Sequence, residues 1–196
     1  MKKLFLIFSV LLTTVTCMAD GHLMFKGNEI DGNISSFCQK LINQGYRKVY
    51  TTDEGDACML KGSFAGFDDC QIAVLSTQDN HIVWKVVVYL PEQTSWYSLK
   101  SRFNDFKTSL TEKYGTPRND YHYFTDPYYE GDGYELQALS KEKCTYYVTY
   151  EVTGGIVALD MQSAGYGKGE ILIKYEDAAN LLLQQSSKKK SVADDL

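Results

Sequence analysis

The clearest alternation of apolar and polar residues lies between positions 82 and 90. Every second residue there is apolar and would point to one side: Ile82, Trp84, Val86, Val88 and Leu90. This period of two predicts a half-buried antiparallel strand. Positions 78–80 hold Gln, Asp and Asn, which favour a turn, so the apolar run from position 70 would form a hairpin with this strand.

After Pro91 the apolar spacing lengthens to three and four residues, which predicts an amphipathic helix. Thr94 or Ser95 would cap its start, and Gly115 followed by Pro117 would end it. One stripe carries its apolar side chains: Trp96, Leu99, Phe103, Phe106, Leu110 and Tyr114. The hairpin offers the surface that such a stripe would cover.

The same two periods recur along the rest of the chain. Helices are predicted between the capping residue Asn33 and Gly45, and at 134–141 and 177–185. Further strands are predicted at 58–64, 144–152, 156–161 and 170–175. The segment 49–56 is expected to be an extended arm or a loop. The segment 118–133 is expected to be a long loop, with an irregular strand at 121–125 inside it.

Together these elements predict an α+β domain at 20–185. Two tandem helix-βββ-helix units, at about 20–117 and 118–185, would form one six-stranded antiparallel sheet with the helices on one face. The other face would be partly open and would carry Val83, Val87, Tyr89, Tyr147 and Thr149. Residues 186–196 are predicted to be a disordered polar tail.

The first 19 residues have the pattern of a signal peptide. Lys2 and Lys3 precede an apolar stretch at 4–15, and Ala19 is a small residue at the expected cleavage position. The apolar stretch is shorter than the roughly 20 residues that a membrane-spanning helix needs. We therefore expect a periplasmic or secreted protein that begins at Asp20. The alternative is a lipoprotein anchored through Cys17, although the residues before Cys17 fit a lipid-attachment site poorly.

Composition and charge restrict the class of partner. Of the 196 residues, 44% are hydrophobic and 13% aromatic, which is enough for a packed core. Loss of Lys2 and Lys3 with the leader would change the formal net charge from −5 to −7. An acidic chain is a poor nucleic-acid binder, because that binding depends on neutralising phosphates. The basic run at 188–190 belongs to the predicted tail and is expected to be solvated.

Four cysteines would remain after export, and all four are disulfide candidates: Cys38, Cys58, Cys70 and Cys144. An even number in an oxidising compartment favours disulfides, and four cysteines allow three pairings. Cys38 and Cys58 both fall on predicted core faces and are the first candidate pair. The alternative is that some of the four are buried free thiols.

The sequence contains none of the common catalytic motifs. The three histidines, His22, His81 and His122, form no HExxH motif, and there is neither a GxSxG motif nor a phosphate-binding loop. Asp126 and Glu130 lie in an acidic segment whose spacing differs from that of a calcium-binding loop. The cysteine spacing is not that of a zinc site. We expect no catalytic residue, no metal and no cofactor.

Fifteen tyrosines are present, and four of them fall in the segment 118–133: Tyr121, Tyr123, Tyr128 and Tyr129. Tyrosine suits contact surfaces because it buries a ring while keeping a polar tip. Tyrosine-rich loops bind protein partners in this way. These four residues are the candidate binding residues, and the alternative is that they pack back on the sheet.

Several short segments resemble uncharacterised secreted proteins of gut anaerobic bacteria: HLMFKG at 22–27, IDG at 30–32, GSFAG at 62–66 and KYGTP at 113–117. This resemblance implies export and carries no activity. The predicted order of helices and strands is also similar to the β-lactamase-inhibitor-protein fold, which has two tandem units of helices on an antiparallel sheet. The second similarity concerns architecture and implies no site residue.

The sequence thus predicts a non-enzymatic binding module of the cell envelope or exterior. It would contact a protein or peptide through the open sheet face or the tyrosine-rich loop, with no nucleic acid, and with the membrane only if Cys17 is lipidated. One alternative is a hydrolase whose site assembles from distant residues, such as His122 beside Asp126 or Glu130. Another is a structural lipoprotein of the envelope.

Overall fold

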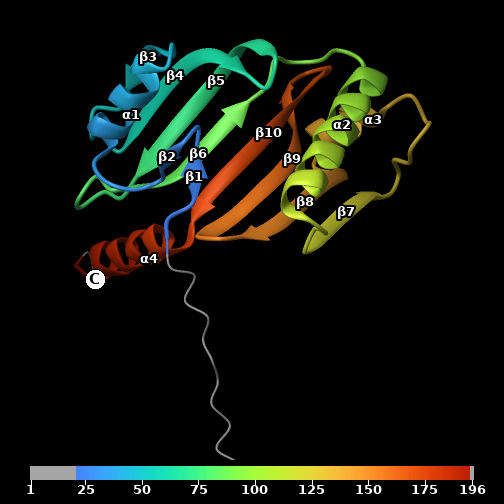
Figure 1. The fold of residues 1–196 in the computed structure, drawn as a ribbon. Coiled ribbons are helices and arrows are strands. Elements are labelled where there is room, and N and C mark those ends of the chain that lie inside the picture. Colours follow the sequence, from blue (N-terminus) through green and yellow to red (C-terminus); the bar gives the residue numbers. More distant parts are fainter. Residues whose placement is uncertain (1–20, 195–196) are drawn as a thin grey trace, which may run out of the picture.

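The computed structural model describes residues 21–194, with side chains described to Lys188. An eight-stranded antiparallel sheet forms its centre (Figure 1). The strands lie side by side in this order: β3 (Arg47–Thr51), β4 (Ala57–Phe64), β5 (Phe67–Ser76), β6 (Val83–Tyr89), β10 (Lys168–Asp177), β9 (Gly155–Gly165), β8 (Cys144–Val152) and β7 (Asn119–Phe124). A separate two-stranded hairpin contains β1 (Met24–Phe25) and β2 (Asn28–Glu29). The predicted leader, with Cys17, lies outside the described residues.

The large sheet consists of two four-stranded meanders, and each follows a helix. The first is α1 (Ile34–Asn43) with β3 to β6, and the second is α2 (Trp96–Tyr114) with β7 to β10. The halves join through their last strands, where Val87 of β6 lies opposite Lys174 of β10. A short helix, α3 (Glu135–Ser140), lies between β7 and β8, and α4 (Ala178–Asp194) follows β10.

The predicted six-stranded sheet of two helix-βββ-helix units is therefore wrong. The sheet has eight strands and the fold is mostly β. In each half one helix precedes four strands, and in the second half α3 is inserted between β7 and β8. The two strands that the predicted sheet lacks are β3, which overlaps the start of the arm expected at 49–56, and β7, which overlaps the irregular strand expected at 121–125. Both are edge strands with mostly exposed side chains. Because an edge strand buries little, its sequence lacks the apolar alternation that predicts a strand.

The helices α1, α2 and α3 and the β1–β2 hairpin pack on one face of the sheet, called here the covered face (Figure 1). The predicted stripe of α2 is confirmed, since Leu99, Phe103 and Leu110 are buried and its other apolar residues pack against the core. Ser95 caps α2 and Gly115 ends it, as expected. Asn33 likewise caps α1 by accepting a 2.9 Å hydrogen bond from the backbone N–H of Ser35.

The alternation predicted for β6 fails at Trp84. The register shifts between Leu75 and Ser76 of β5, which makes Trp84 an extra residue, a β-bulge. Val83, expected on the open face, is therefore buried in the main core, and Trp84 is half-buried outside that cluster. A single extra residue reverses the side to which every residue beyond it points.

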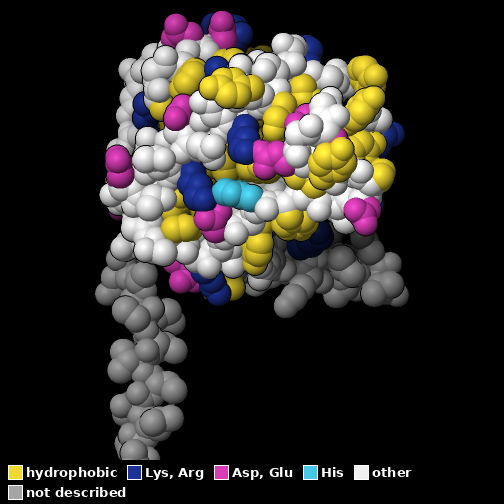
Figure 2. All heavy atoms as spheres, turned by 90° about the vertical axis from the view of Figure 1, so that its right-hand side faces the viewer, with side chains coloured by type: hydrophobic (Ala, Val, Ile, Leu, Met, Phe, Trp, Pro, Cys, Tyr) yellow, Lys and Arg dark blue, Asp and Glu magenta, His cyan; other side chains and the backbone are white. Residues whose placement is uncertain are grey.

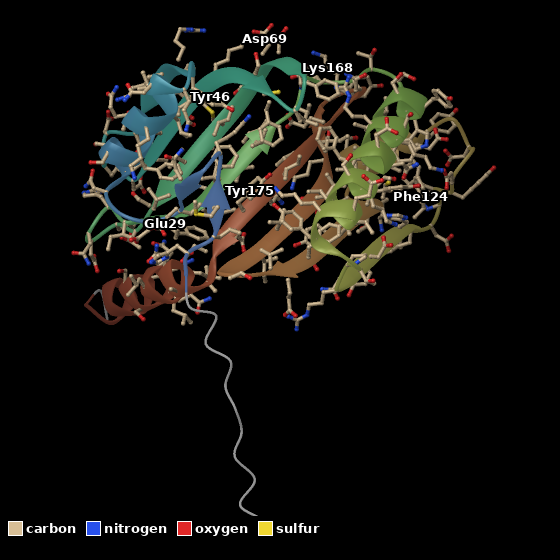
Figure 3. All side chains as sticks on the ribbon, in the orientation of Figure 1. Glu29, Tyr46, Asp69, Phe124, Lys168 and Tyr175 are labelled. Atoms are coloured by element: carbon tan, nitrogen blue, oxygen red, sulfur yellow. The ribbon has the colours of Figure 1, made fainter. Side chains whose placement is uncertain are left out.

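The β1–β2 hairpin is attached to the covered face by aromatic packing. The ring of Phe25 lies 5.1 Å from that of Tyr175 of β10, edge to face, and 6.1 Å from that of Phe64 of β4. Figure 3 labels Tyr175 beside the hairpin.

Within residues 21–194, no helix combines the length and the apolar character that crossing a membrane requires.

Candidate functional site

The face of the sheet opposite α1, α2 and α3, called here the open face, is defined by the strand register. Residues directly opposite each other on antiparallel strands share a face. One row crosses all eight strands: Tyr50, Met59, Ala73, Val87, Lys174, Ala158, Thr149 and Asn119. The adjoining rows contain Gln71, Tyr89, Leu172, Asp160, Tyr147 and Tyr121, then Leu75, Lys85, Glu176, Ile156 and Glu151. The predicted residues Val87, Tyr89, Tyr147 and Thr149 do lie on this face.

An apolar strip runs over the first half of the open face and crosses to the second. Ala73, Val87 and Leu172 form a small cluster of their own, with exposed fractions of 9%, 4% and 3%. Met59 and Tyr89 pack against this cluster and remain half-exposed. The strip is separate from the main core and is not needed to hold the helices in place.

Two ion pairs cross the centre of the open face, where the two halves meet. The Lys85 ammonium lies 2.6 Å from the Glu176 carboxylate, and the Lys174 ammonium lies 2.5 Å from the Asp160 carboxylate. All four side chains are largely shielded from solvent. Each pair joins neighbouring strands, so the charges are held in fixed positions rather than on flexible tips.

A hollow of about 300 Å³ opens on this face, over β7, β8, β9 and β10. Tyr147, Thr149, Ile156 and Ala158 line it, and charged side chains surround them. The size suits one side chain of a partner, and it is at the lower end of the range for small-molecule pockets. Mixed apolar and polar walls would hold an anchor that has both a hydrophobic body and a polar tip.

Glu170 is the one open-face carboxylate in the described chain that has neither an ion pair nor a hydrogen bond. It is half-buried on β10, on the same side as Tyr89. Burial raises the pKa of its carboxyl, and the nearby Glu92 acts in the same direction. Glu170 is therefore a half-buried carboxylate without a cation partner at the margin of the apolar strip.

The four candidate tyrosines are divided between two places. Tyr121 and Tyr123 lie on β7 opposite Tyr147 and Thr145, so both belong to the open face. Tyr128 is half-buried and packs against the main core, and Tyr129 is exposed in the following loop. The first two residues thus join the open face, whereas the loop itself holds one exposed tyrosine of the four.

His122 lies on the other side of β7 and contacts α2. Its ring stacks on Tyr146 at 4.8 Å, and its Nε2 lies 3.0 Å from Asp120. Lys107 also binds Asp120, at 2.5 Å. Burial lowers the pKa of His122, and Lys107 adds to this effect. Figure 2, which views this side, shows a histidine among acidic and basic side chains.

The hydrolase alternative required a different arrangement around His122. The partner of His122 is Asp120, whereas Glu130 accepts hydrogen bonds from Lys100 and, at 3.4 Å, from the Tyr146 hydroxyl. Lys107 binds the same Asp120 carboxylate, so Asp120 is shared between a histidine and a lysine. His122 is thus not paired with either of the carboxylates named for the hydrolase alternative, Asp126 and Glu130.

A second polar cluster is buried where residues 22–31 meet the start of α4. Asp177 is fully buried and accepts hydrogen bonds from the backbone of Leu23 at 2.8 Å, the backbone of Asn180 at 2.9 Å and the ring of His22 at 3.1 Å. The Asn180 amide donates to the backbone oxygens of Ile30 and of Val83, each at 3.0 Å. Every contact is internal, so this cluster fastens the β1–β2 hairpin and serves the fold.

All four candidate cysteines are free thiols and are buried, so the disulfide prediction is not met in this structure. Cys38 of α1 and Cys58 of β4, the first candidate pair, do lie beside each other. Within residues 21–188, no group of three or more His, Cys, Asp and Glu side chains is arranged to hold a metal ion.

Comparison with known proteins finds no family model, no curated protein and no solved structure that matches the chain. The geometry of the sheet therefore carries the functional argument. Sequence reasoning missed the ion pairs and Glu170, although β10 alternates Glu170, Lys174 and Glu176 with apolar residues. That alternation shows that the charges share a face, but their partners follow only from the register with β6 and β9.

Proposed function

We propose that this protein is a non-enzymatic binding module of the cell envelope or exterior that docks a protein partner on the open face. The observation that carries the proposal is the combination on one face of an apolar strip, fixed ion pairs and a side-chain-sized hollow. Protein interfaces have this composition, with an apolar centre, a polar surround and pockets for anchor residues.

Tyrosines support the same surface. Tyr50, Tyr89, Tyr121, Tyr123 and Tyr147 lie along the open face from one edge strand to the other. Burial raises the pKa of both Tyr89 and Tyr147, so their hydroxyls stay protonated donors at neutral pH. Aromatic side chains of this kind supply large contact areas with few rotatable bonds.

The charges indicate what the partner presents. Asp160 and Glu176 are neutralised by lysines within the face, whereas Glu170 is not. A partner that placed a lysine or arginine near Glu170 would supply the missing cation beside the ring of Tyr89, where a cation is also favoured by the aromatic face. We therefore propose a partner with a basic side chain next to an apolar or aromatic anchor.

Site-specific photocrosslinking tests the proposal. A photoreactive amino acid would replace Tyr89 or Tyr147 on the open face, and Tyr97 or Tyr166 as controls, which are 82% and 96% exposed elsewhere. We expect the two open-face positions to trap the same protein in the native cell, and Glu170→Lys to abolish trapping by reversing the charge that the partner meets.

Three results would contradict the proposal. The control positions could trap the same species, Glu170→Lys could leave trapping unchanged, or the crosslinks could join two copies of this chain. The variant Tyr129→Ser tests the contribution of the loop alone. It keeps the strand β7, which a deletion of 119–133 would remove. If Tyr129→Ser alone abolishes trapping, the loop is the contact and the open face is not.

A further inference from the structure

Two cysteine thiols face each other between α1 and β4. Cys38 lies on the inner side of α1 and Cys58 on the covered face of β4, with exposed fractions of 4% and 3%. The neighbouring Cys38 lowers the pKa of the Cys58 thiol, Thr51 and Lys48 act in the same direction, and burial opposes them. The neighbouring Cys58 raises the pKa of Cys38, and burial acts in the same direction.

A hollow of about 170 Å³ gives access to this thiol pair from outside. Cys38, Cys58, Lys48 and Thr51 are among the side chains that line it. The Thr51 hydroxyl is buried and has no hydrogen-bond partner within the described chain, and Thr51 lies on β3 directly opposite Cys58. Lys48 is the charged group beside the pair, and the residue opposite Cys58 on β5 is the uncharged Val74.

The other two cysteines have different surroundings. Cys70 is fully buried, and its Sγ donates to the backbone oxygen of Phe67 at 3.4 Å. Cys144 also borders a hollow, of about 370 Å³, but burial raises the pKa of its thiol to about 12, with Glu130 and Glu135 adding to the effect. Access alone therefore does not distinguish Cys58 from Cys144. A neighbouring thiol, hydroxyl and cation distinguish it.

We propose that Cys38 and Cys58 form a redox-active dithiol that a low-molecular-mass disulfide oxidises to an intramolecular disulfide. The Cys58 thiolate attacks one sulfur of the small disulfide, a mixed disulfide forms, and the other half leaves as a thiolate. Cys38 then loses its proton to solvent and attacks the Cys58 sulfur, which releases the second half. The protein loses two electrons and two protons, and the small disulfide gains them as two thiols.

This reaction has a structural consequence. The new bond would join α1 to β4 and would close a loop of chain that contains all of β3. Because a cross-link restricts the unfolded chain, the oxidised protein should resist denaturation more than the reduced one. The pair is thus a modification site that tightens the covered face and leaves the open face unaltered.

Thiol labelling of the intact chain provides the first test. Each cysteine would be alkylated with iodoacetamide between about pH 5.5 and 8.5, and its rate followed by peptide mass spectrometry, with Cys70 and Cys144 as internal controls. We expect Cys58 to react at least about tenfold faster than Cys144 at neutral pH, and Lys48→Met to slow Cys58 alone. Equal rates for Cys58 and Cys144 would overturn the proposal.

Oxidation by glutathione disulfide provides the second test. We expect a single disulfide-linked peptide pair containing Cys38 and Cys58, no such pair in Cys38→Ser, which should instead keep glutathione on Cys58, and an unchanged reaction in the matched control Cys144→Ser. A disulfide between other cysteines, or none in the unmodified chain, would overturn the proposal. The unmodified chain gives the answer even if Cys38→Ser folds poorly.

Discussion

The two faces of the sheet use the same strands in opposite ways. The covered face buries large side chains completely, among them Phe25, Phe37 and Phe103, under helices and a hairpin. The open face buries fewer and smaller side chains, Ala73, Val87, Leu172, Ala158 and Thr149, and holds charges in pairs. The covered face therefore carries the stability of the fold, which leaves the open face free to be shaped by binding.

The largest expected effect distinguishes the two faces directly. Phe103→Ala removes a fully buried ring that packs against Tyr146 and His122. Loss of a buried aromatic side chain should reduce the free energy of unfolding by about 3–5 kcal/mol. Urea denaturation followed by circular dichroism measures it.

The matched change on the open face is Tyr147→Ala, which removes a half-buried aromatic side chain. We expect it to cost less than about 1.5 kcal/mol, because much of that ring already contacts water. If both variants lost similar stability, the covered face would not be the main source of the stability of the fold.

The second effect concerns the polar cluster that fastens the hairpin over the covered face. Asp177→Ala would leave the backbone N–H groups of Leu23 and Asn180 without their acceptor. Buried donors without partners should cost about 2–4 kcal/mol in total. Hydrogen exchange should also show faster exchange in β1 and β2 than in β8.

Asp160→Ala is the matched control for Asp177→Ala, because it removes a carboxylate from the open face. The same loss of stability and the same exchange pattern in both variants would show that the buried cluster has no special role in holding the hairpin.

How much the sequence predicts also differs between the faces. The stripe of α2, its cap at Ser95 and its end at Gly115 were predictable, because burial imposes a strict period and helix ends need particular residues. The edge strand β3 was not, and β7 was predicted only as an irregular strand inside a loop, since exposed positions tolerate any polar residue. Trp84 was misplaced because a bulge leaves no mark in the local sequence.

For the candidate site, the sequence identified the kinds of residue but not their grouping. Val87, Tyr89, Tyr147 and Thr149 were placed on the open face by alternation alone. Tyr121 lies opposite Tyr147, and Lys174 forms an ion pair with Asp160, only because their strands are neighbours in the sheet. Those neighbours are set by long-range pairing, which one sequence does not reveal.

A smaller effect is expected from the ion pairs of the open face. Lys174→Met, Asp160→Asn and the double variant form a mutant cycle for the pair that lies at 2.5 Å. We expect a coupling free energy of about 0.5–1 kcal/mol, because the attraction is offset by desolvation and is partly screened. A coupling above about 3 kcal/mol would mean that the open face is as important for stability as the covered face.

The smallest effect is a pair of opposite pH dependences, one for each face. Burial lowers the pKa of His122 on the covered face, so the folded state resists protonation and loses stability as the pH falls through the unfolded pKa of about 6.5. Burial raises the pKa of Glu170 on the open face, so the folded state resists ionisation and loses stability as the pH rises above 4.5.

The two variants His122→Gln and Glu170→Gln separate these contributions. Relative to the unmodified protein, Glu170→Gln should gain stability between about pH 4 and 7, whereas His122→Gln should lose less stability than the unmodified protein when the pH falls from about 7 to 5. Each change should stay below about 1 kcal/mol, because both side chains are partly solvated. Urea titrations at matched ionic strength measure both slopes. The contributions of His122 and Glu170 to stability should change with pH in opposite directions. If both changed in the same direction, burial would not be what shifts these two pKa values, and Glu170 would not be the carboxylate of the open face that lacks a cation.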